Sequence, residues 1–169
     1  GLMYGMSAYG LASRTGLSID EARRFIEAYF ERFSQVENYF DETLAFAHEH
    51  GYVETVMGRR RYFPMLKATD EGNSRAQRAA ERAAINMPIQ GSAADILKIA
   101  MIRLYDLLRE RDLRSRLILQ IHDELMLKVP EDELATTQEL VVDTMESAYE
   151  LVVPLKVDAA VGQNWMEMK

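Results

Sequence analysis

The first fifty residues have a pattern of apolar and polar positions that predicts helices. A short helix is expected near residues 7–14, and a longer one after Ser18, which forms a candidate capping box with Glu21. Ser34 and Glu37 repeat this box before a second long helix. Each long helix carries an apolar stripe at helical spacing, which we expect to be buried. The stripes are Ala22, Phe25, Ile26, Tyr29, Phe30 and Phe33, and then Val36, Tyr39, Phe40, Thr43, Leu44 and Ala47.

A short hairpin is predicted next. Residues 52–57 alternate between apolar and polar, and Gly58 begins a turn. The returning segment opens with three consecutive arginines, Arg59, Arg60 and Arg61. Three such residues cannot share one face of a strand, and they repel one another. A run of this kind is usually solvated. In a hairpin, contact of the arginines with phosphate is an alternative interpretation of comparable weight.

The following segment is predicted to be helical from about Ser74, after a polar loop at 68–73. Helical spacing relates Arg78 to Arg82, and Asn86 follows four residues later. This spacing places cationic and amide side chains along one flank of the helix.

Pro88 is expected to end or kink this helix, because the residue before a proline avoids the α region. Gln90 and Gly91 then form the junction. Ser92 and Asp95 resemble another capping box, which is a sufficient structural reason for the aspartate. A second long helix would follow it and end near Arg111.

Two short apolar runs, 117–121 and 125–129, predict a second hairpin around His122, Asp123 and Glu124. The connection contains no Gly, Pro or Asn, so turn chemistry does not explain it. Crowding two carboxylates costs free energy unless a cation or hydrogen bonds offset it. These residues alone leave two interpretations open: a divalent metal site at Asp123, with Glu124 as a second candidate ligand, or a solvated hairpin tip.

The last forty residues predict a helix and a strand. Acids that follow Pro130 suit the start of a helix, which Pro154 would break. Residues 155–161 are predicted to form a final strand, and Gly162 and Trp165 close the chain. Helices come first and strands mixed with helices follow, so the pattern indicates an α+β fold with a small antiparallel sheet.

Charge is distributed unevenly along the 169 residues. The net charge of −7 argues against a polyanionic partner, but residues 59–82 sum to +4 and residues 123–169 to −8. This contrast suits a protein that holds phosphates in one place and a metal in another. The chain has no Cys and no apolar run of membrane-spanning length. It opens without Met, so we expect a piece of a longer protein.

The spacing of the candidate residues excludes several kinds of catalytic or nucleotide-binding site. His48 and His50 are two residues apart and point to different sides of a helix, and no His-Glu-x-x-His motif is present. The chain has no Gly-x-Ser-x-Gly elbow, phosphate-binding loop or dinucleotide-binding glycine pattern. Three features remain: a carboxylate hairpin, a helix that bears arginines and amides, and Tyr and Gly residues at a helix end. Together they suit metal-assisted phosphoryl or nucleotidyl transfer.

Five segments of the chain match segments of one known family in the same order. They are Gly1-Leu-Met-Tyr-Gly-Met-Ser-Ala8, residues 54–62, residues 81–95, Gln120-Ile-His-Asp-Glu124 and residues 162–165. Through them the sequence resembles the family A DNA polymerases, the bacterial DNA polymerase I type, over essentially its whole length. Residues 120–124 are similar to motif C of that family, and residues 1–8 to the end of its motif B helix.

The resemblance implies an α+β fold in two parts: a helical fingers segment at 1–58 and a palm segment at 59–169 that bears the motif C hairpin. It implies template-directed addition of deoxynucleoside triphosphates to a primer 3′ end, with two Mg²⁺ ions. Primer–template DNA would be the macromolecular partner. The whole protein would be a monomer in the bacterial cytoplasm, associated with the nucleoid.

Residue roles follow from the same resemblance. Asp123 would ligate the Mg²⁺ ions, with Glu124 beside them as a catalytic neighbour. Gln120 and His122 would lie close to the primer terminus, and Tyr4 would stack near the incoming nucleotide.

The resemblance also implies DNA contacts outside motif C. Arg82, Asn86 and Gln90 would follow the minor groove, where shared acceptors report base-pair shape. Arg59 to Arg61 would touch the DNA backbone.

The family's other metal-binding Asp, and its nucleotide-gripping Arg and Lys, lie upstream of the matched segments. We therefore expect the 169 residues alone not to extend a primer. Two alternatives remain: a non-catalytic DNA-binding relative, and an acidic globular protein whose hairpin carboxylates are merely solvated.

Overall fold

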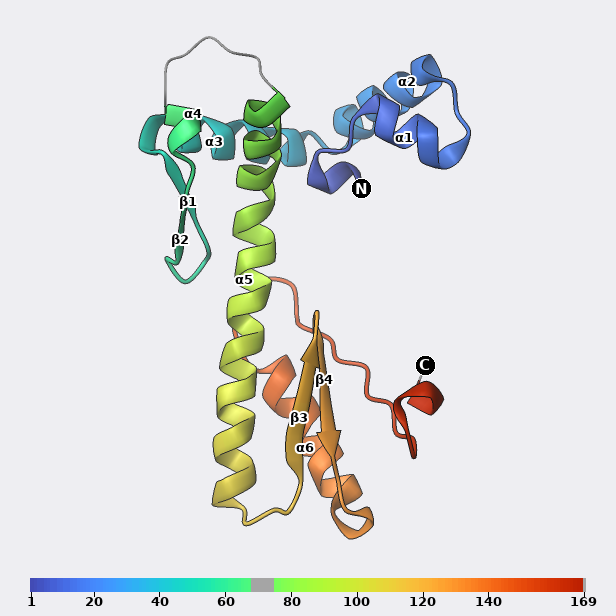
Figure 1. Cartoon of the computed structure of the whole chain (residues 1–169), viewed down its shortest axis with the longest axis vertical. Helices are drawn as coiled ribbons and strands as arrows, with labels where there is room; N and C mark the ends of the chain where they lie inside the picture. The colour runs from blue at the N-terminus through green and yellow to red at the C-terminus, as the bar shows by residue number, and fades with distance from the viewer. Residues whose placement is uncertain (68–74, 169) are drawn as a thin grey trace. The chain divides into compact units, whose positions relative to one another are not determined.

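The computed structural model describes residues 1–67 and 75–168 (Figure 1). The chain divides into two compact units, Gly1–Ser92 and Ala93–Lys169, and helix α5, Arg75–Glu110, contributes to both. Each unit combines helices with one two-stranded antiparallel sheet, so the α+β prediction is confirmed. The predicted loop 68–73 and the predicted helix start at Ser74 lie outside the described residues. No described helix has the length and apolar character needed to cross a membrane.

The first unit begins with helices that the sequence largely predicts. They are η1 (Leu2–Tyr4), α1 (Ala8–Thr15), α2 (Ile19–Arg32) and α3 (Ser34–His50).

The capping box of α2 is confirmed and that of α3 is wrong. The Ser18 hydroxyl accepts from the Glu21 amide at 3.3 Å, and the Glu21 carboxylate accepts from the Ser18 amide at 2.9 Å. Helix α3 begins one residue after Phe33 and has no side-chain cap, because Ser34 is itself the first helical residue. The close succession of α2 and α3 leaves Ser34 no extended backbone from which to cap.

The expected burial of the first apolar stripe is wrong for two of its phenylalanines. Ala22 is fully buried, but Phe25 and Phe33 are about half exposed, at 55% and 50%. In the second stripe Phe40 and Ala47 are buried. Helical periodicity identifies an apolar face correctly without saying whether the described residues cover it.

The predicted Gly58 hairpin forms with strands shorter than expected. Strand β1 is Tyr52–Glu54, β2 is Arg60–Tyr62, and helix α4 (Pro64–Lys67) follows. Val53 pairs with Arg61 in the antiparallel register. One face of the hairpin packs into the core of this unit, which consists of Ala47, Val53, Phe63, Leu66, Ala84 and Met87.

The predicted end of the helix at Pro88 is wrong, because α5 continues past the proline. Proline removes one backbone donor, at a cost of about 3 kcal/mol in a helix interior. Burial of Ala84, Ile85 and Met87 beside the proline offsets that cost. The predicted capping box at Ser92 is also wrong, because Ser92 lies inside the helix, where its hydroxyl donates to the Pro88 carbonyl.

The second unit contains the predicted carboxylate hairpin. Strand β3 (Arg116–Ile121) pairs with β4 (Glu124–Lys128), with an irregularity of register at Ile118. Leu125 and Leu127 of β4 pack on a core formed by Leu104, Leu108 and Leu140.

Two C-terminal predictions are wrong. Helix α6 (Leu134–Glu146), which follows η2 (Glu131–Glu133), ends well before Pro154. The Arg103 guanidinium donates to the Ser147 and Ala148 carbonyls at 3.1 and 3.0 Å and so satisfies the chain where the helix stops. Residues 155–161 form no strand, because no other described strand pairs with them, and η3 (Trp165–Met168) closes the chain.

Glu133 fastens the start of β3 to the start of α6. Its carboxylate accepts from the Ser115 hydroxyl at 2.7 Å and from the Arg114 and Ser115 amides, both at 2.9 Å. The Arg114 guanidinium adds a bond at 3.0 Å. These donors, the Ser115 hydroxyl foremost, lower the pKa of Glu133 from 4.5 to about 2.

The lowered pKa of Glu133 predicts that the free energy of unfolding decreases at low pH. Because the folded pKa of Glu133 lies below the unfolded value, its contribution is complete above about pH 4.5 and is lost as pH falls toward 2. Glu133→Gln should lower the melting temperature at pH 7 and reduce the drop in melting temperature between pH 5 and pH 2. Circular dichroism melts across this range measure both effects. Glu139→Gln, on the exposed side of α6, is the control, and equal behaviour of the two variants would refute the assignment.

Candidate functional site

The carboxylate hairpin has a two-residue connection. Ile121 pairs with Glu124, so His122 and Asp123 alone form the bend. His122 has a φ of 53°, a conformation that glycine or asparagine usually supplies in such turns. The Gln120 amide donates to the His122 carbonyl at 2.6 Å, which ties the strand to the bend. A side chain of β3 thus supports a turn that the residues of the connection do not explain.

The tip of this hairpin presents carboxylates to solvent. Asp123 and Glu124 are both exposed, as are His122 and Gln120. Among the described residues, no three Asp, Glu, His or Cys side chains lie close enough to hold a metal ion. Mg²⁺ is commonly held by one or two carboxylates together with substrate phosphates and water. The exposed pair therefore fits part of a Mg²⁺ site, with Asp123 at the tip.

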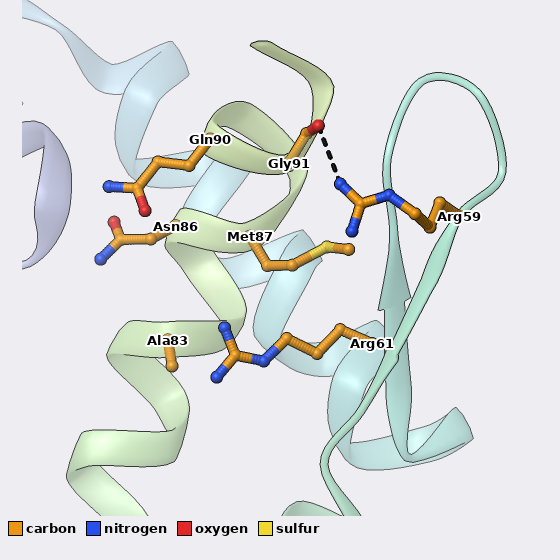
Figure 2. A pocket seen from close by; sticks show the side chains of 7 residues that line it. All are labelled: Arg59, Arg61, Ala83, Asn86, Met87, Gln90 and Gly91. Atoms are coloured by element: carbon orange, nitrogen blue, oxygen red, sulfur yellow. Dashed lines mark hydrogen bonds between the residues drawn. The ribbon is translucent and has the colours of Figure 1, made fainter. Parts of the chain in front are cut away.

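Helix α5 carries the predicted amide and arginine flank in the first unit. Arg82, Asn86 and Gln90 recur every four residues, and Figure 2 shows the Asn86 and Gln90 amides on one side of the helix. Met87 points instead toward the β1–β2 hairpin. The Asn86 side-chain oxygen is buried and has no hydrogen-bond partner among the described residues. An unpartnered amide oxygen beside an exposed arginine and glutamine is suited to a polar ligand.

The start of the chain lies against this flank. Gly5, which ends η1, has a φ of 71°, and a Cβ added there would lie 3.1 Å from Cγ of Arg82. The structure therefore brings the segment that bears Tyr4, which is 46% exposed, next to Arg82. Tyr4 and Arg82, which belong to different sequence motifs, therefore lie in adjacent segments of the first unit.

The three arginines of the β1–β2 hairpin do not act as one group. Arg59 and Arg61 line a cavity of about 340 Å³ beside α5, together with Asn86, Gln90, Ala83, Met87 and Gly91. Arg60 lies on the opposite face of the hairpin, where its guanidinium binds Glu54 at 2.6 Å. The expectation that three consecutive arginines cannot share one face is correct.

Sequence reasoning missed the residues that fasten this hairpin to α5. Arg59 donates to the Gly91 carbonyl at 3.0 Å (Figure 2), and the Val56 amide donates to the Ser92 hydroxyl at 3.0 Å. A Cβ on Gly91 would lie only 2.8 Å from the Thr55 methyl carbon, so glycine permits this approach. A glycine inside a helical pattern, followed directly by serine, is the signal that could have indicated the contact.

The predicted site residues fall into the two units. Gln120, His122, Asp123 and Glu124 belong to the second unit, and the structure brings them together on one hairpin. The others belong to the first unit: Tyr4, Arg59, Arg60, Arg61, Arg82, Asn86 and Gln90.

The family model for DNA polymerase family A matches residues 1–167. The chain therefore belongs to DNA polymerase family A.

Similar proteins are DNA polymerases I of several bacteria. The chain is 51% identical to DNA polymerase I of Chloroflexus aurantiacus, over 99% of this chain and 18% of that protein. It is 47% identical to the thermostable DNA polymerase I of Thermus filiformis, over 100% of this chain and 20% of that protein. The chain thus spans about a fifth of the length of these relatives.

A solved structure shares the fold. It is the POL domain of Pol1 from M. smegmatis, in complex with DNA primer-template and dNTP. The match has a TM-score of 0.91 and 46% identity, and covers 99% of this chain and 29% of that one.

Proposed function

We propose that the chain is the C-terminal part of a DNA-templated DNA polymerase that adds deoxynucleotides to a primer 3′ end. The observation that carries this proposal is the exposed Asp123 at the tip of a motif C hairpin, in a chain that belongs to DNA polymerase family A. We keep residues 1–58 as the fingers segment and 59–169 as the palm segment. The whole protein would act as a monomer with the nucleoid in the cytoplasm.

Asp123 is the residue that would hold Mg²⁺, with Glu124 as its neighbour at the primer end. Two such ions would activate the primer hydroxyl and stabilise the charge that develops on the leaving pyrophosphate. The hairpin's part is to hold the Asp123 carboxylate at a fixed exposed point, and the Gln120 bond to the His122 carbonyl supports that geometry.

The α5 flank would bind the minor groove of the primer–template. Arg82 and the amides of Asn86 and Gln90 offer donors to the acceptors that every base pair presents there. The guanidinium groups of Arg59 and Arg61 in the neighbouring cavity suit backbone phosphates. Tyr4, brought beside Arg82, would stack near the incoming nucleotide.

A non-catalytic DNA-binding module is the second candidate. It is favoured by the first unit, which gathers the α5 flank and the cavity arginines without any part of the carboxylate hairpin. The two candidates differ in chemistry and agree on DNA contact. In either case, the 169 residues alone are not expected to extend a primer, since the family's upstream Asp, Arg and Lys are not among them.

DNA binding tests the part that both candidates share. In a full-length protein carrying this chain, Arg82→Ala should weaken primer–template binding about five- to a hundredfold. Fluorescence anisotropy at several salt concentrations measures the dissociation constant and its salt slope. Arg32→Ala, which removes an equal charge from exposed α2, is the control and should change little. A flat salt response, or equal effects of both variants, would contradict the proposed interface.

A further inference from the structure

The turn between β1 and β2 is organised by one buried side chain. Thr55 is 5% exposed, and its hydroxyl oxygen accepts from the Met57 amide at 3.3 Å and from the Arg59 amide at 3.1 Å. The Thr55 backbone closes the same turn, because its amide donates to the Arg59 carbonyl at 3.0 Å and its carbonyl accepts from the Gly58 amide at 2.9 Å. Arg59 is therefore tied to Thr55 through both of its own backbone polar groups.

A second hydroxyl anchors this turn to helix α5. The Ser92 hydroxyl, which donates to the Pro88 carbonyl, also accepts from the Val56 amide at 3.0 Å. Ser92 is 7% exposed, so this hydroxyl lies where water competes little for its bonds. The Thr55 methyl group packs beside Gly91, where an added Cβ would come within 2.8 Å of it. The turn is thus fixed on α5 by hydrogen bonds and by close packing.

The Arg59 side chain leaves this turn in a fixed direction. Its guanidinium donates to the Gly91 carbonyl at 3.0 Å and lines the same cavity as Asn86 and Gln90 (Figure 2). A guanidinium has five N–H donors in a rigid fork, so a bond to one carbonyl orients the whole group. A freely moving arginine loses rotamer freedom when it binds a phosphate, and that loss weakens binding. For Arg59 much of this loss has already occurred on folding.

We propose that Thr55 and Ser92 are positioning residues, whose hydroxyls hold the β1–β2 turn on α5 so that the Arg59 guanidinium is ordered before DNA binds. This inference rests on the proposed function, in which Arg59 contacts a backbone phosphate of the primer–template. Both hydroxyls belong to buried residues of the first unit and are assigned no contact with DNA. Loss of either one leaves a backbone amide without its acceptor and loosens the turn that carries Arg59.

The test is a double-mutant cycle on primer–template binding in a full-length protein carrying this chain. Arg59→Ala should weaken binding and lower its salt slope by about one. Thr55→Val, which keeps the shape of the side chain and removes its hydroxyl, should weaken binding about three- to tenfold. In the Arg59→Ala background, the Thr55→Val change should have no further effect, because the group that Thr55 positions is gone. Fluorescence anisotropy at several salt concentrations, below the melting temperature of every variant, measures these quantities.

Three further variants separate positioning from a general loss of stability. Thr55→Ser keeps the hydroxyl and should bind primer–template as the unaltered protein does. Thr144→Val removes a buried hydroxyl of the second unit, which donates to the Leu140 carbonyl at 2.6 Å, and should leave the salt slope unchanged. Ser92→Ala removes the anchor to α5 and should show the same dependence on Arg59, which keeps the test decisive if Thr55→Val does not fold.

Two results would overturn this inference alone. One is unchanged binding in Thr55→Val and Ser92→Ala beside a loss in Arg59→Ala, which would leave the proposed phosphate contact standing. The other is an equal loss from Thr55→Val with and without the Arg59 side chain, which would mean that the hydroxyl supports the fold in general. Unchanged binding in Arg59→Ala would refute the phosphate contact as well. Failure of the unaltered protein to bind primer–template would refute the proposed function, so these failures are distinguishable.

Discussion

Asp123→Asn in a full-length protein carrying this chain is expected to lower the rate of nucleotide incorporation by roughly a thousandfold or more. The substitution keeps the size of the side chain and removes the charge that would hold Mg²⁺. The dissociation constant for primer–template should change little, because in the proposed site Asp123 contacts metal and not DNA phosphate. Rapid-quench incorporation in Mg²⁺ measures the rate, and anisotropy measures the dissociation constant.

The matched control is Asp106→Asn, an equal change at an exposed position of α5 in the same unit. It should leave both quantities as they are. If Asp123→Asn incorporated nucleotides at an undiminished rate, the hairpin tip would be a solvated turn and not a metal site. A parallel loss of DNA binding would mean that the substitution disturbs the hairpin and not a metal site.

Leu104→Ala is expected to cost about 2–5 kcal/mol in the free energy of unfolding. Leu104 is fully buried and packs with Leu108 and Leu140, on which Leu125 and Leu127 of β4 rest. The lost side chain leaves a cavity under the strand that follows Asp123. Incorporation should therefore fall at temperatures well below the new unfolding midpoint.

Ile102→Ala is the control for this core. It removes an aliphatic side chain of the same size two residues away on α5, where Ile102 is 64% exposed. Its cost should stay within about 0.5 kcal/mol in urea unfolding followed by circular dichroism. Equal costs for the two variants would show that Leu104 does not lie in the core of this unit.

Local patterns predicted the features that local chemistry determines. The capping box of α2 needs only Ser18 and Glu21. The first hairpin follows from alternation before Gly58, and the second from two short apolar runs on either side of His122, Asp123 and Glu124. The family assignment was accessible for the same reason, since each motif is a short run of residues.

The errors arose where distant residues decide the outcome. Met87 and its neighbours are buried beside Pro88 in a helix that continues past the proline, and Arg103 binds the carbonyls that follow the early end of α6. Neither contact is visible in the local sequence. A strand at 155–161 needs a partner, which its own sequence cannot supply. The contact of Gly91 with the β1–β2 hairpin was missed because it joins segments more than thirty residues apart.

The most direct test of the central claim is template-directed primer extension in Mg²⁺, run in parallel on a full-length protein carrying this chain and on the 169 residues alone. The account predicts that the full-length protein adds the nucleotide complementary to the template. It also predicts that the 169 residues add none. Binding without extension by the full-length protein would establish the non-catalytic alternative, and extension by the 169 residues would contradict the claim that upstream residues complete the site.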